Sequence, residues 1–88
     1  MPAELRPADS RVVVPDLGFD GRPVVVGQWL AGVGDEVVAG DRIAELICDG
    51  VLFYAEAAGG GRLSRTMRAV GDVVRAGDEL AVVEADAP

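Results

Sequence analysis

The sequence predicts a small all-β domain, in which two halves of related sequence form a sandwich or flattened barrel of short strands. Three observations support this prediction. No window of the 88 residues has the 3.6-residue apolar period of a helix. Glycine and aspartate recur at short intervals between apolar runs, as they do where tight turns join strands. Segment 33–49 is repeated, with changes, as segment 70–86.

The two copies of the repeat lie 37 positions apart and are identical at nine of seventeen positions. Each copy reads V-G-D-x-V-x-A-G-D-x-apolar-A. This pattern predicts a Gly-Asp turn, a short strand, a second Gly-Asp turn and a longer strand. One half alone has no second layer against which to bury its apolar face, so we expect the two halves to pack about a pseudo-two-fold axis.

A tail, two strands and a loop are predicted before the first copy of the repeat. Residues 1–10, rich in proline, alanine and charge, predict a disordered tail. Residues 11–14 predict a strand that ends at Pro15, and residues 16–21 a loop rich in turn formers. Residues 23–30 predict the second strand. A single domain is therefore expected over 11–86, with 87–88 as a tail or the start of a linker.

The two halves meet at Asp49-Gly50, which joins the apolar runs 42–48 and 51–55. Asp-Gly between strand-like runs predicts a two-residue hairpin turn, because both turn positions need a positive φ. The hairpin then pairs Cys48 with Val51, Ile47 with Leu52, Leu46 with Phe53, and Glu45 with Tyr54. Alternation places one set of side chains on the core face: Ala44, Leu46, Cys48, Val51, Phe53 and Ala55. It places a second set on the solvent face: Glu45, Ile47, Leu52 and Tyr54.

The amino-acid composition argues against several classes of function. The net charge of −7 disfavours nucleic acids and anionic membranes as partners. The chain has no histidine, which is the commonest general base and metal ligand. All eight basic side chains are arginines, so there is no lysine. With no catalytic constellation visible, we expect a protein that is not an enzyme. The single cysteine and the absence of an 18-residue apolar run favour the cytoplasm.

From about Val12 to Glu84 the chain resembles the lipoyl/biotinyl carrier family, and most of all the lipoyl domains of 2-oxo acid dehydrogenase acyltransferase components. The resemblance rests on these motifs: Val14-Pro15-Asp16-Leu17-Gly18, Gln28-Trp29-Leu30, Val33-Gly34-Asp35, Ala39-Gly40-Asp41, Ile43-Ala44-Glu45, Gly61, Gly71-Asp72 and Gly77-Asp78. It implies a flattened barrel, the barrel-sandwich hybrid, with two four-stranded antiparallel sheets. The hairpin tip then lies at the opposite end from the chain termini.

The tip departs from that family. There the tip reads Glu-Thr-Asp-Lys-Ala, and its lysine carries the lipoyl group. The matching positions here read Ile47-Cys48-Asp49-Gly50-Val51, so Gly50 stands at the lysine position beside Asp49. The resemblance therefore implies a carrier scaffold with neither lipoyl nor biotin, and no cofactor is expected. An engineered lysine-to-glycine change is an alternative explanation of Gly50.

Exposed apolar side chains beside the tip suggest a protein-binding surface at Ile47, Leu52 and Tyr54. The alternative is that such cross-strand pairs only stabilise the hairpin, by about 0.2–1 kcal/mol each. Cys48, also beside the tip, is expected to be core filler, because the alternation of side chains along the strand directs its thiol inward.

Three other motifs have plain structural explanations. The glycines at 59–61 predict a flexible turn, since no Lys-Ser/Thr or helix follows them. Asp35, Asp41, Asp72 and Asp78 are expected to form turns, because calcium-loop spacing is missing. Among Arg62, Arg65 and Arg68, alternation would put 62 and 68 on one side of a strand and 65 on the other. They would form at most a weak anion patch.

The leading hypothesis is a non-lipoylated, lipoyl-like module that binds protein partners, with subunits of a 2-oxo acid dehydrogenase complex as the candidates. One alternative is a free-standing structural or adaptor module unrelated to dehydrogenases. Efflux adaptors of that kind insert a helical hairpin where this chain has only Asp49-Gly50. A second alternative is a degenerate carrier remnant. No metal, membrane, nucleic-acid or small-molecule partner is expected.

Overall fold

The computed structural model describes residues 8–86, which form eight antiparallel strands in two four-stranded sheets. The strands are β1 (Ser10–Val13), β2 (Val24–Trp29), β3 (Glu36–Val37), β4 (Arg42–Cys48), β5 (Val51–Glu56), β6 (Gly61–Thr66), β7 (Val73–Val74) and β8 (Glu79–Glu84). One sheet has the order β1-β8-β6-β3 and the other β5-β4-β2-β7. The all-β prediction and the predicted sheets are confirmed. Over these residues no helix is long and apolar enough to cross a bilayer.

The two sheets are related by the predicted pseudo-two-fold axis. Exchanging β1 with β5, β2 with β6, β3 with β7, and β4 with β8 converts one strand order into the other. The irregularities repeat as well: the ladder registers of β2 and β6 shift at Gly27 and Ser64, which lie 37 positions apart. The sequence repeat therefore encodes a repeat of backbone geometry.

The Gly-Asp turns are built identically in the two halves. The carboxylate of Asp35 accepts a 2.8 Å hydrogen bond from Gly32 N–H, and that of Asp72 accepts one of 2.8 Å from Ala69 N–H. Asp41 and Asp78 do the same at 2.9 Å. All four aspartates thus satisfy backbone donors in turns. No cluster of potential metal ligands occurs among residues 8–86.

The core lies between the sheets and is mainly aliphatic. Its fully buried members come from both halves and include Val12, Val26, Ile43, Leu46, Leu63, Leu80 and Val83. Trp29 covers one side of this core, and its indole N–H donates a 3.1 Å hydrogen bond to the carbonyl of Arg68. With few aromatic residues, the core depends on close interdigitation of valine, leucine and isoleucine across a thin sandwich.

The boundaries differ slightly from those expected. The first strand starts at Ser10, within the segment predicted as a tail, and the carboxylate of Asp9 accepts a 2.8 Å hydrogen bond from Ala85 N–H. That bond connects the two ends of the described chain. Residues 1–7 of the predicted tail, and the predicted tail or linker at 87–88, lie outside the described residues.

Of the glycines predicted as a flexible turn, Gly59 and Gly60 lie in the connection after β5, whereas Gly61 does not. Gly61 is the first residue of β6, with φ +151°, and a methyl group added there would lie 1.9 Å from the carbonyl oxygen of Glu84. A methyl group at Gly60 would make an ordinary contact, 3.4 Å from the carbonyl oxygen of Val37. Position 61 requires glycine because β6 and β8 approach each other closely there.

Candidate functional site

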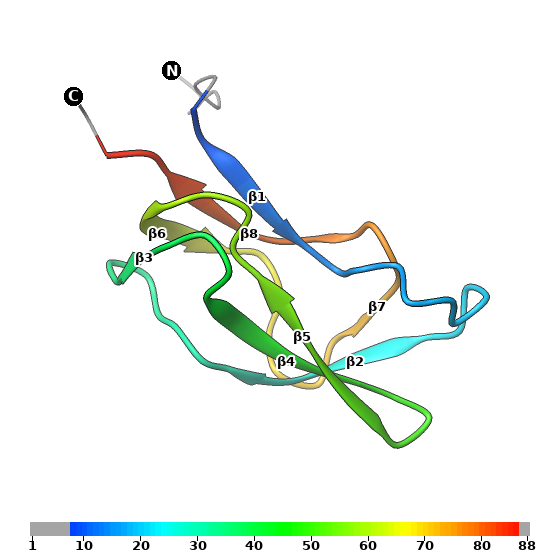
Figure 1. Cartoon of the computed structure of the whole chain (residues 1–88). Helices are drawn as coiled ribbons and strands as arrows, with labels where there is room; N and C mark the ends of the chain where they lie inside the picture. The colour runs from blue at the N-terminus through cyan, green and yellow to red at the C-terminus, as the bar shows by residue number, and fades with distance from the viewer. Residues whose placement is uncertain (1–7, 87–88) are drawn as a thin grey trace.

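The hairpin tip between β4 and β5 has the predicted geometry. Asp49 and Gly50 both have positive φ, +50° and +78°, as a type I′ turn requires. All four predicted cross-strand pairs are observed, from Cys48 with Val51 to Glu45 with Tyr54. The tip lies at the far end of the molecule from the first and last described residues, as predicted (Figure 1).

The tip projects into solvent and carries no amine. A Cβ atom added at Gly50 would meet no other atom within 4 Å, so the position is open. Asp49 is held instead by an ion pair with Arg22, whose Nε also donates a 2.9 Å hydrogen bond to the Phe19 carbonyl. Sequence reasoning missed Arg22, because the pair spans 27 positions and only the fold brings it together.

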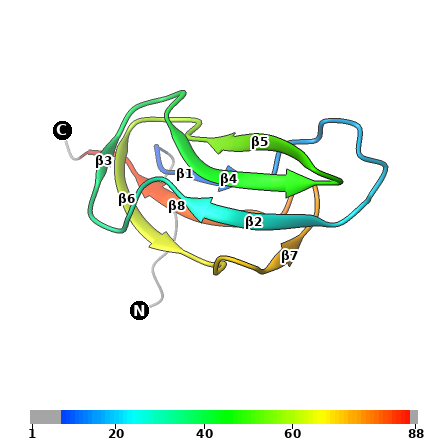
Figure 2. The ribbon, with the colours of Figure 1, turned by 90° about the horizontal axis from the view of Figure 1, so that it is seen from below.

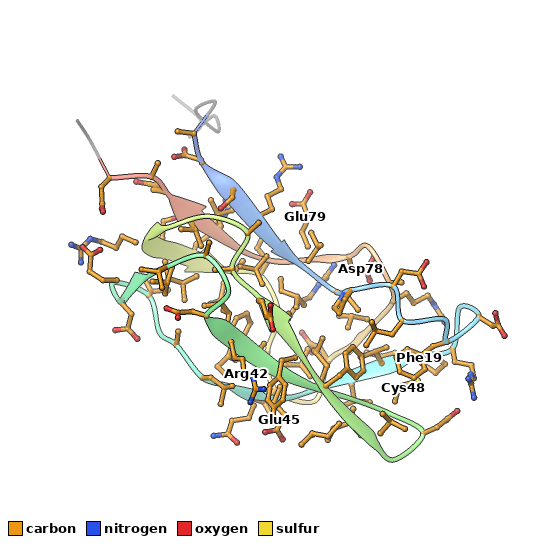
Figure 3. The ribbon with its side chains drawn as sticks, viewed as in Figure 1. Phe19, Arg42, Glu45, Cys48, Asp78 and Glu79 are labelled. Atoms are coloured by element: carbon orange, nitrogen blue, oxygen red, sulfur yellow. The ribbon has the colours of Figure 1, made fainter. Side chains whose placement is uncertain are left out.

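Residues 15–23 form a long connection that packs against one side of the tip. Phe19 lies 5.1 Å from Phe53, measured between ring centroids, and at the same end of the molecule as Cys48 (Figure 3). Cys48 is 1% exposed, which confirms it as core filler. The tip is therefore a supported structure, with a packed inner side and an open end.

The outer face of the hairpin carries the predicted apolar side chains. Ile47 and Leu52 lie opposite each other and are 37% and 50% exposed. Tyr54, partly buried, lies under the guanidinium of Arg42 at 4.2 Å from the ring centroid. This stacking makes the Tyr54 ring less available than predicted, while Ile47 and Leu52 remain available for contact.

Val51 shares the predicted face with Cys48, but the expectation that the core covers this face is wrong at Val51. Its side chain is 51% exposed, although its partner Cys48 on the same face is buried. The reason is tertiary: β4 has a strand on each side, whereas β5 is an edge strand at the end of the hairpin (Figure 2). Strand parity specifies the face of a side chain but does not specify whether anything covers that face.

The apolar pair belongs to a longer row that the sequence does not reveal. Ladder registers place Ile47 beside Val25 of β2, and Val25 beside Val73 of β7. The outer face of this sheet thus carries exposed apolar side chains on four adjacent strands, which we call the apolar row: Val73, Val25, Ile47 and Leu52. Such continuity is more indicative of a binding surface than scattered exposed residues are.

The arginines of β6 were predicted on alternating sides, and this is wrong. The register shift at Ser64 places Arg62 opposite Glu84 and Arg65 opposite Val82, so both arginines occupy the outer face. Arg62 pairs with Glu36 at 2.6 Å and Arg68 follows the end of the strand. These side chains do not form a clustered anion site.

Comparisons with known proteins place the fold in a family. The model of the Biotin_lipoyl family, described as "Biotin-requiring enzyme", matches residues 10–83. The chain belongs to this family. No curated protein matches the sequence.

Solved structures with the same fold include two carboxylases. A single-chain, multi-domain long-chain acyl-CoA carboxylase is 22% identical, with a TM-score of 0.73, over 98% of this chain and 8% of that one. The urea carboxylase of Kluyveromyces lactis is 24% identical, with a TM-score of 0.72, over 92% of this chain and 7% of that one. At these identities the likeness shows the fold. The chain spans less than a tenth of the length of either carboxylase.

The expected link to 2-oxo acid dehydrogenase complexes receives no support from these comparisons, because both neighbours are carboxylases. What is shown is the wider carrier family and its barrel-sandwich fold.

Proposed function

We propose that this domain is a carrier-type scaffold that carries neither biotin nor a lipoyl group and works by binding protein partners. The observation that carries the proposal is the composition of the tip. The turn has the geometry of a presenting hairpin, yet it consists of Asp49 and Gly50, and the chain has no lysine. Attachment of a carboxylic cofactor as an amide needs a side-chain amine at the tip, so these residues do not fit a covalent biotin or lipoyl group.

The apolar row supports the binding half of the proposal. Its four side chains span a whole sheet, next to the end of the molecule that points away from the described termini. A partner that covered the row would remove this apolar surface from water, at about 25 cal/mol for each Å² buried. We propose that the domain has no catalytic role of its own and acts in the cytoplasm.

Carboxylase-type assemblies are the partners that the structural neighbours favour. Both neighbours are large carboxylases of which a domain of this fold occupies a small part. We therefore propose association with carboxylase components in place of the dehydrogenase subunits expected from sequence.

Modification is tested on the purified chain with biotin ligase and biotin, and separately with lipoate ligase and lipoate. Intact mass is expected to stay unchanged in both reactions. The matched variant Gly50→Lys supplies one amine at an open position and is expected to gain one cofactor from at least one ligase. A mass gain on the unsubstituted chain contradicts the proposal.

Partner binding is tested by affinity capture from the source organism's soluble extract, with proteins identified by mass spectrometry. We expect carboxylase components on the unsubstituted bait and at least tenfold less on Val25→Thr/Ile47→Thr. The control bait is Arg62→Thr/Glu84→Thr, which changes the positions related by the pseudo-two-fold axis. Equal capture by all three baits would remove the apolar row from the proposal. Capture of no carboxylase component would favour the remnant alternative.

A further inference from the structure

Strand β5 is the longest sheet edge in the described chain and the least protected. The other edge strands, β1, β3 and β7, have four, two and two residues, whereas β5 has six, with the sequence VLFYAE. Its ladder with β4 is regular from the tip to Ala55, and the register shift lies beyond it, between Arg42 and Ala44. Proteins usually protect such an edge with a short strand, a bulge, a proline or a lysine. Residues 51–55 have none of these.

The tight turn determines which backbone groups of β5 face away from β4. A two-residue hairpin makes Cys48 and Val51 a hydrogen-bonded pair, and the pattern then alternates. The N–H and C=O groups of Leu52 and Tyr54 therefore point to the free edge. Within residues 8–86, neither backbone bonds to another segment outside the ladder. The free edge of β5 therefore offers two N–H donors and two C=O acceptors, spaced so that a neighbouring strand can bond to them.

A groove follows this free edge. Its volume is about 600 Å³, and we call it the edge groove, with these lining residues: Val13, Pro15, Leu17, Leu52, Phe53, Tyr54 and Glu56. Three of them, Leu52 to Tyr54, are consecutive, although their side chains alternate between faces. The groove therefore opens along the edge of β5 and exposes its backbone, with β1 and the start of the 15–23 connection as its opposite wall.

The fold does not require this groove, because the equivalent place in the other half is filled. Under the pseudo-two-fold axis, the segment after β5 occupies the place of the segment after β1. There the short connection 57–60 lies against β1, and a methyl group at Gly59 would contact the Ser10 side chain at 3.4 Å. The longer connection 14–23 covers the inner side of β5, where Phe19 stacks on Phe53, but it leaves the edge groove open beside Leu52 and Tyr54.

We propose that the edge groove binds an extended peptide segment of a partner protein, which adds to the sheet as an antiparallel strand beside β5. This inference rests on the proposed function, since it specifies how the partner is held. The free backbone groups of Leu52 and Tyr54 call for the backbone of a strand, and the apolar walls call for apolar side chains at alternate positions.

The negative charge of Glu56 at one end of the groove favours a basic residue at the matching end of the peptide. Glu56 lines the groove at the end of β5 away from the tip. Arg42 lies opposite it in the ladder but stacks on Tyr54, and no ion pair involves Glu56 among residues 8–86. A lysine or arginine of the peptide beside Glu56 would complement this charge. The expected ligand is therefore an extended, alternately apolar segment with a basic residue at one end.

The probe is a displayed library of random twelve-residue peptides, selected against the full chain. We expect selected peptides to show the alternating apolar pattern with a basic residue. Bound peptide should slow amide hydrogen exchange at Leu52 and Tyr54 by about tenfold or more, since both amides become hydrogen-bonded. This readout uses the unsubstituted chain, so it does not depend on the folding of a variant.

Two variants at one position separate the backbone from the side chain. Tyr54→Thr keeps the N–H, and Tyr54→Pro removes it without breaking the ladder with β4. Tyr54→Pro is expected to bind the selected peptide about tenfold more weakly than Tyr54→Thr. Glu56→Gln is expected to weaken binding about threefold and to reduce its salt dependence.

The proposal is overturned if no peptide is selected, if bound peptides leave both amides unprotected, or if the Tyr54 variants bind equally. Dimerisation of the free chain, abolished by Tyr54→Pro, would also overturn it in favour of pairing with a second copy. Carboxylase capture that survives in Tyr54→Pro leaves the proposed function standing while this inference fails. Attachment of a cofactor to the unsubstituted chain would contradict both the proposed function and this inference.

Discussion

The outer faces of the two sheets have the same backbone geometry and opposite chemistry. On one sheet the apolar row runs across all four strands. At the related positions of the other sheet, adjacent strands present Glu36, Arg62 and Glu84, which we call the charged row. Arg62 pairs with Glu36 there at 2.6 Å. The fold therefore accepts either kind of side chain at these outer positions, and this difference is what supports the proposed binding role of the apolar row.

The inner parts of the two halves differ far less. The turns, the register shifts and the buried valines and leucines recur at the 37-position offset. Several inner positions therefore carry similar residues in both halves, although buried Val24 is replaced by Gly61 at the related position. This contrast between inner and outer positions can be tested by substituting related positions in the two halves.

The largest effect is expected where the two halves have opposite steric requirements. Gly61 cannot accept a side chain beside Glu84, whereas Val24, at the related position, is a buried core residue. Gly61→Ala is expected to lower the free energy of unfolding by at least about 3 kcal/mol. Val24→Ala, which leaves a cavity, should cost about 1–3 kcal/mol. Urea denaturation measures both, and a tolerated Gly61→Ala would mean that β6 and β8 can separate.

A smaller and equal effect is expected where the halves are identical. Asp35→Ala and Asp72→Ala each remove a charge-assisted hydrogen bond of 2.8 Å to a backbone N–H. Each should lower the free energy of unfolding by about 1 kcal/mol, because the turns are exposed to water. The two losses should agree within about 0.5 kcal/mol. A clear inequality in urea denaturation would show that the halves differ in stability despite their common geometry.

The smallest effect is expected from the exposed ion pairs. Arg22–Asp49 at the tip and Arg62–Glu36 on the other sheet are both about half exposed. Double-mutant cycles with alanine should give coupling energies below about 1 kcal/mol for each, decreasing with salt. A much larger coupling at the tip would assign Arg22 a role in holding the turn, beyond that of a surface pair.

Much of the fold could be predicted from the sequence because its signals are local. A Gly-Asp or Asp-Gly turn is specified by a few adjacent residues, and Asp49-Gly50 alone predicts the β4–β5 register from the tip as far as Ala44 and Ala55. The inward positions of Leu46 and Phe53 follow from strand parity. The outward positions of Ile47 and Leu52 follow from the same alternation, without any contact between distant segments.

The repeat, the turns, the hairpin pairing and the absence of any lysine can all be recognised in the printed chain alone. Which surfaces remain uncovered depends on how the strands pack. The exposure of Val51, the shift at Ser64 that turns Arg65 outward, and the alignment of Val25 and Val73 with Ile47 all depend on pairing between strands far apart in the chain. Local patterns specify the direction of a side chain, whereas its neighbours are specified by packing over the whole domain.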